Sequence, residues 1–149
     1  MYERFSDSVR AAVAVAHDLA IRRGNPVCQT GHLLAGICAT SARRENRLLE
    51  HLDLSANAIE SYLNADSAEP LRRTVWFLRW SFRPRTPQSD AFVCTIESAI
   101  ENARDRSSPQ INVNDILLGL LAAGPNDALK LLNKLGIDAT ELRESCNAG

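Results

Sequence analysis

Hydrophobic residues recur along this chain in two series that match each other at a constant offset of 83 residues. Val13, Ala16 and Leu34 in the first series correspond to Ile96, Ala99 and Leu117 in the second. The register holds without a gap from about residue 6 to about residue 62. Spacings of three and four residues within each series predict amphipathic helices. A self-similar pattern of this length predicts a chain built from two related units.

The first unit is predicted to contain four helices. Ser6-Asp7 is suited to cap the first helix, and Gly24-Asn25-Pro26 is suited to end it. A second helix is expected from about Thr30 and a third from near Ala42. A short fourth helix is expected after Ser55, a residue that often occupies the N-cap position.

The second unit repeats this order. Ser89 is expected to open its first helix, and either Asn112 or Asn114 is expected to cap the second. Pro125 is predicted to lie in the first turn of the third helix, where a missing N–H group is tolerated. The fourth helix is expected to begin near Asp138.

These elements predict an all-α fold. We expect two tandem four-helix repeats related by a pseudo-twofold axis and packed as one domain. A length of 149 residues agrees with a single compact domain, residues 1–149. Within it, repeat one is expected to span residues 1–63, a linker residues 64–88, and repeat two residues 89–146.

The linker differs from both repeats in composition. Both tryptophans, two of the four phenylalanines and five arginines lie between residues 71 and 85. Tryptophan and arginine are frequent at the energetic centres of protein interfaces, so the segment is a candidate binding site. The alternative is a strap that folds back over the groove between the repeats. The candidate partner-binding residues here are Trp76, Phe77, Arg79, Trp80 and Phe82.

The sequence offers little that would support catalysis. It contains no nucleotide-binding P-loop, no G-x-S-x-G and no H-E-x-x-H pattern. We therefore expect no enzyme activity, no catalytic residue, no cofactor and no metal site. A net charge of −1 gives no reason to expect nucleic acid, and the apolar runs are short for a membrane span. The N-terminus does not resemble a signal peptide, which favours a cytoplasmic location.

None of the four cysteines forms a C-x-x-C pair. Three of them align with aliphatic residues of the other copy, which is typical of small buried hydrophobic side chains. We therefore expect core thiols in a reducing compartment, which agrees with the cytoplasm. The cysteines are Cys28, Cys38, Cys94 and Cys146.

The histidines are too few and too scattered to indicate a metal site. His17 aligns with Ile100 and is expected to pack between helices. His32 aligns with Asp115, and both are expected in the first turn of the second helix of their repeat. A hydrogen-bonding side chain at that position can hold the preceding loop.

Two segments resemble a known family. Residues 1–7, Met-Tyr-Glu-Arg-Phe-Ser-Asp, and residues 30–37, Thr-Gly-His-Leu-Leu-Ala-Gly-Ile, resemble the N-terminal domain of bacterial Clp ATPases of the ClpC and ClpA type. Residues 114–120, Asn-Asp-Ile-Leu-Leu-Gly-Leu, resemble the same element a second time. The family carries this motif in each of two four-helix repeats, so the resemblance extends over nearly the whole chain outside the linker.

The resemblance implies a non-catalytic protein-recognition module. In the family, this domain receives adaptors and substrates and passes them to the ATPase ring, so the implied partners are Clp ATPase or protease subunits, adaptors or substrates. One alternative is a free-standing accessory protein similar to ClpT that docks on a Clp protease core. Another alternative is an unrelated scaffold that binds through the aromatic and basic linker.

The resemblance also implies candidate site residues. The family's hydroxyl residue that opens each repeat is matched by Ser6 and Ser89, and an aromatic residue near the start is matched by Tyr2. The family's glutamate that holds phosphorylated arginine is replaced by Gly31 in the first copy and by Asn114 in the second. Because a guanidinium group needs a carboxylate partner, we do not expect phosphoarginine recognition.

Overall fold

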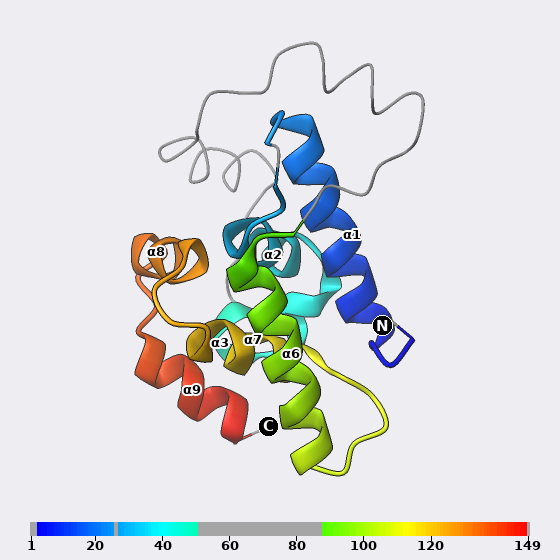
Figure 1. Ribbon diagram of the computed structural model, residues 1–149. Coiled ribbons are helices and arrows are strands. Elements are labelled where there is room, and N and C mark those ends of the chain that lie inside the picture. The colour runs from blue at the N-terminus through cyan, green and yellow to red at the C-terminus, as the bar shows by residue number, and fades with distance from the viewer. Residues whose placement is uncertain (1–2, 26, 51–87, 149) are drawn as a thin grey trace.

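A computed structural model of the chain describes residues 3–25, 27–50 and 88–148. These ranges contain helices and two isolated β-bridges but no β-strand, which confirms the all-α prediction. The predicted fourth helix of repeat one and the linker as far as residue 87 lie outside the described residues. The helices are α1 (Asp7–Arg22), α2 (Thr30–Ala39), the 3₁₀ helix η1 (Ser41–Glu45), α3 (Arg47–Glu50), α6 (Asp90–Asp105), α7 (Val113–Ala122), α8 (Asp127–Lys134) and α9 (Ala139–Asn147), shown in Figure 1.

The first helices of the two repeats begin in the same way. Ser6 Oγ accepts a hydrogen bond of 3.3 Å from the Val9 N–H group at the start of α1. Ser89 Oγ accepts one of 3.2 Å from the Phe92 N–H group at the start of α6. Each serine thereby satisfies one of the N–H groups that a helix start leaves without a partner. The predicted caps are confirmed at both positions.

The same two helices also end in the same way. Gly24 after α1 has a φ of 66°, and Ser107 after α6 has a φ of 54°. The residues that follow, Asn25 and Ser108, each donate a backbone hydrogen bond of 2.9 Å back to Ala20 and Ala103. This is the left-handed helix ending that glycine favours, and serine adopts it here without glycine's conformational freedom.

A glycine allows the second helix of each repeat to cross the first at close range. A Cβ atom built on Gly36 would lie 2.2 Å from the carbonyl oxygen of Ala12 on α1. One built on Gly119 would lie 2.4 Å from the carbonyl oxygen of Thr95 on α6. These distances leave no room for any side chain, so α1 with α2 and α6 with α7 form two equivalent helix pairs.

The two repeats are joined through each other's opening segments. Phe5 and Ile111 form one parallel bridge, and Cys28 and Gln88 form the other. The Ser6 N–H group donates to Ile111 O, and the Ser89 N–H group donates to Cys28 O, both at 3.0 Å. The two contacts are equivalent, because Gln88 follows Phe5 by 83 residues and Ile111 follows Cys28 by 83 residues. The opening residues of each repeat are therefore held by the loop before the second helix of the other repeat.

One apolar core runs through both repeats. Leu33, Leu34 and Ile37 of α2 are buried, as are Leu117 and Leu120 of α7. Helix α2 of repeat one also packs against α8 and α6 of repeat two. His17 on α1 lies with its ring centre 6.0 Å from that of Phe92 on α6, which confirms its predicted role in helix packing.

Three sequence predictions need correction. Ala42 lies in the 3₁₀ helix η1, because Asn46 caps a separate α3 that begins only at Arg47. Pro125 lies before the N-cap Asn126 and not in the first turn of α8. Cys94 is exposed on α6, whereas the other three cysteines are buried. Its alignment with Ala11 was a poor guide to burial, because Ala11 is itself exposed on α1.

Candidate functional site

Three helix N-termini from both repeats meet at one small cavity. Its volume is about 160 Å³. The N-cap residues of α2, α6 and α8 are Gln29, Ser89 and Asn126, and all three contribute to the lining. Because helix starts present N–H groups without helical partners, this junction can offer hydrogen-bond donors to a bound group. The full lining is Gln29, Thr30, Ser89, Ala91, Asn126 and Asp127.

A buried polar network fixes two sides of this junction. The Thr30 hydroxyl donates to Asn126 Oδ1 at 3.3 Å and accepts from the Ala128 N–H group at 3.1 Å. Asn126 Nδ2 donates to the carbonyl oxygens of Leu120 and Gly124. Thr30 therefore helps to cap a helix of the other repeat. Its equivalent in repeat two is Val113, which has no hydroxyl, so this link exists in one direction only.

His32 holds the loop before α2 as the sequence predicted. Its Nδ1 accepts a 3.0 Å hydrogen bond from the Gln29 N–H group, and its Nε2 lies 3.0 Å from the side-chain amide of Asn25. Burial, and to a smaller extent the nearby Arg23 cation, lower the pKa of His32 to about 4, while Asp127 opposes the shift. The neutral imidazole is the form that can accept the Gln29 hydrogen bond.

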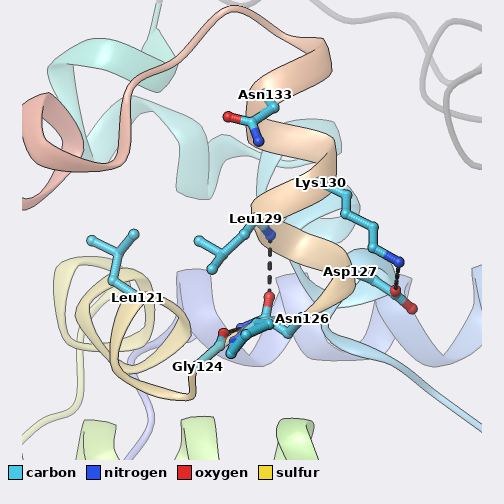
Figure 2. Close-up of a pocket in the computed structure, with 8 residues that line it drawn as sticks. Leu121, Gly124, Asn126, Asp127, Leu129, Lys130 and Asn133 are labelled. Carbon is cyan, nitrogen blue, oxygen red and sulfur yellow. Dashed lines mark hydrogen bonds and ion pairs between the residues drawn. The ribbon is translucent and has the colours of Figure 1, made fainter.

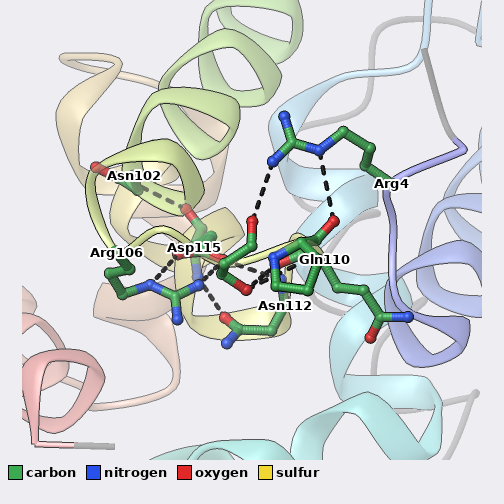
Figure 3. Close-up of polar contacts among 8 residues, drawn as sticks. Arg4, Asn102, Arg106, Gln110, Asn112 and Asp115 are labelled. Carbon is green, nitrogen blue, oxygen red and sulfur yellow. Dashed lines mark hydrogen bonds and ion pairs between the residues drawn. The ribbon is translucent and has the colours of Figure 1, made fainter.

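Asp115 holds the equivalent loop of repeat two, but it does so with a carboxylate in place of an imidazole. Its Oδ2 accepts from the Asn112 N–H group at 2.9 Å, which identifies Asn112 and not Asn114 as the cap of α7. Arg106 donates from both Nε and a terminal nitrogen to the two oxygens of this buried carboxylate. Figure 3 shows Arg4 reaching the same loop from another side, where it donates to the carbonyl oxygens of Ser108 and Pro109.

Asn114 takes part in a separate polar contact between the two repeats. Its Oδ1 accepts a 3.1 Å hydrogen bond from Asn46 Nδ2, and the same Asn46 nitrogen lies 3.0 Å from the hydroxyl of Ser145. Asn46, the residue directly before α3, therefore links α7 to α9. Gly31, the equivalent of Asn114 in repeat one, is buried and has no side chain to offer. At this position repeat two has a hydrogen-bonding side chain and repeat one has none.

A larger cavity of about 550 Å³ lies between the end of α7 and the start of α8. Figure 2 shows Leu129 pointing toward Leu121, while Asp127 and Lys130 lie on another side of α8. Lys130 Nζ lies 3.7 Å from Asp127 Oδ1. The cavity shares Asn126 and Asp127 with the smaller one, so both open beside the first turn of α8.

The structure places only part of the predicted site. Ser6 and Ser89 are both N-caps, and Ser89 also lines the small cavity. Sequence reasoning missed Thr30 and Asn126, whose pairing depends on how the two repeats pack. The remaining candidates lie outside the described residues: Tyr2, Trp76, Phe77, Arg79, Trp80 and Phe82.

Two further features of the described ranges bear on chemistry. No three histidine, cysteine, aspartate or glutamate side chains in them gather closely enough to hold a metal ion. Across the same residues, no helix combines the length and the apolar character that crossing a bilayer requires.

Comparison with curated proteins gives matches along almost the whole chain. The chain is 24% identical over 146 residues to the negative regulator of genetic competence ClpC/MecB of Bacillus subtilis. It is 23% identical over 144 residues to the chaperone protein ClpB of Oceanobacillus iheyensis. Each match covers 97% of this chain but only 17% of the relative, so the chain spans about a sixth of their length. No protein-family model matches the chain.

Solved structures give the same picture of the fold. The N-terminal domain of the chaperone ClpD from Arabidopsis thaliana superposes with a TM-score of 0.70 and 22% identity, covering 99% of this chain and 98% of that one. The Hsp104 N-terminal domain from Candida albicans gives a TM-score of 0.66 and 16% identity, covering 97% and 89%. The chain thus has the fold of a Clp N-terminal domain, and its sequence is similar to Clp chaperones along nearly its whole length.

Proposed function

We propose that this chain is a non-catalytic protein-recognition module that binds adaptors or substrates for a Clp-type AAA+ chaperone or protease. The observation that carries the proposal is the agreement in fold over 99% of the chain with the N-terminal domain of ClpD. The duplicated motif supports it, because both copies occupy the equivalent helix start. As part of the proposal, residues 1–149 act as one domain in the cytoplasm, with protein partners and without a cofactor, nucleic acid or membrane.

The small cavity at the junction is the proposed recognition surface. It combines residues from three helices and both repeats, so its shape exists only when the repeats are correctly packed. Ser89 is the predicted site residue that lines it, and Ala91 lies beside it on α6 with partial exposure. Interface residues that sit on rigid helices are held in place before binding, which reduces the entropy lost when a partner docks.

A quantitative capture experiment tests the proposal. The immobilised chain is incubated with extract of its own source cells, and Clp ATPase subunits, Clp protease subunits and their adaptors are measured by mass spectrometry. The variant Ala91→Arg places a long charged side chain at the cavity. Ala14→Arg makes the same change at an exposed position of α1 that is not part of the lining. We expect enrichment with the unmodified chain and with Ala14→Arg, and a loss of at least tenfold with Ala91→Arg.

The outcomes of this experiment distinguish an error in the proposed function from an error in the proposed binding surface. If neither the unmodified chain nor Ala14→Arg enriches any Clp component or adaptor, the proposed function is wrong. If all three proteins enrich them equally, the function stands and the junction is not the recognition surface. Circular dichroism of each variant checks that the helical fold is intact before the capture results are compared.

A free-standing accessory protein is the alternative function. A ClpT-like accessory would contact the protease core directly, so purified protease core without any ATPase would retain the chain. A recognition module of an ATPase would instead require an adaptor or a substrate. Binding to the isolated protease core, measured by size-exclusion chromatography, therefore distinguishes the two.

An unrelated scaffold that binds through the linker is the other alternative. The linker residues that would carry such binding are Trp76, Phe77, Arg79, Trp80 and Phe82. The double variant Trp76→Ala with Trp80→Ala would then abolish capture, whereas Ala91→Arg would leave it unchanged. The family surface matched by Tyr2, Ser6 and Ser89 is tested separately with Tyr2→Ala, which leaves both serine caps in place.

A further inference from the structure

We draw no further inference here: the strongest candidate, the cavity of about 550 Å³ between the end of α7 and the start of α8, has a lining that is part leucine and part polar, and nothing in the structure shows what covers it.

Discussion

Ser107 and Gly24 adopt the same left-handed backbone at the ends of equivalent helices, with φ angles of 54° and 66°. A residue with a Cβ atom is strained in this region, at a cost of roughly 1–2 kcal/mol. Among the described residues, Ser107 is the one non-glycine residue with positive φ. Repeat two therefore tolerates at this turn a strain that repeat one avoids.

Ser107→Gly is expected to stabilise the protein. Relief of the strained φ is partly offset by the greater freedom of glycine in the unfolded chain, so the net gain is about 0.5–1 kcal/mol. Urea unfolding followed by circular dichroism measures it. The reverse change, Gly24→Ser, is expected to lower stability by a similar amount. A lower unfolding midpoint for Ser107→Gly would contradict this account of the turn.

Gly36→Ala and Gly119→Ala are each expected to destabilise the protein by about 1–3 kcal/mol or more. The added methyl group would meet a backbone carbonyl oxygen at 2.2 or 2.4 Å, and a helix backbone cannot move away as a flexible side chain can. Thermal unfolding measures the loss. Ser98→Ala, at a partly exposed position of α6, is the control and should change the midpoint little. An unchanged midpoint for both glycine variants would show that the helices can separate without cost.

Thr30→Val is expected to cost roughly 1–3 kcal/mol, because the Ala128 N–H group would be left buried without its hydroxyl partner. Valine has nearly the same shape as threonine, so packing is preserved. It is also the residue found at the equivalent position, Val113. Thr140→Val, at an exposed position of α9, is the matched control and should change stability by less than about 0.5 kcal/mol. Equal effects of the two substitutions would mean that the hydroxyl of Thr30 contributes nothing specific.

Stability is expected to fall as the pH drops from about 6.5 toward 4, owing to His32. The folded protein holds the His32 pKa at about 4, below its ordinary value of 6.5, so the unfolded chain binds the proton more tightly. The neutral form stabilises the fold fully above pH 6.5, and the contribution is lost as the pH falls to the folded pKa. Its size is on the order of 3 kcal/mol, at about 1.36 kcal/mol for each pKa unit.

The variant His32→Asp isolates this effect. It places in repeat one the carboxylate that Asp115 supplies in repeat two, where Arg106 binds it. Urea unfolding at several pH values between 4 and 7 compares the two proteins. We expect the unmodified protein to lose more stability than the variant over this range. Parallel pH curves for the two proteins would refute the assignment to His32.

Cys94 is expected to be the one thiol that reacts rapidly with Ellman's reagent in the folded protein. Burial raises the pKa of Cys28 and Cys38 to about 12 and that of Cys146 to about 11, so these thiols are neither accessible nor ionised at neutral pH. Cys94 is exposed on α6. One thiol should react quickly, four should react in denaturant, and Cys94→Ser should remove the fast phase. More than one fast thiol in the unmodified protein would contradict the burial of the other three.

Local features of the fold could be predicted from the sequence, because they depend on neighbouring residues. The serine caps and the hydrogen-bonding roles of His32 and Asp115 follow from short-range patterns. The exposure of Cys94 could not be predicted, since it depends on which face of α6 meets α7. The same holds for Thr30, whose partner is 96 residues away and becomes apparent only once the two repeats are packed.

The reciprocal bridges of Phe5 with Ile111 and of Gln88 with Cys28 have the geometry of a symmetric dimer. In such a dimer, the opening segment of each partner would bind to the other partner. In a symmetric dimer of single repeats, every substitution would appear on both sides of the axis at once. When the two repeats belong to one chain, this constraint is removed. Each repeat can then change in sequence alone while the other repeat still binds its opening segment. The equivalent positions occupied by His32 and Asp115, and by Thr30 and Val113, differ in this way. All four of these residues are buried, so the two repeats differ inside the protein while the reciprocal bridges keep the same paired architecture.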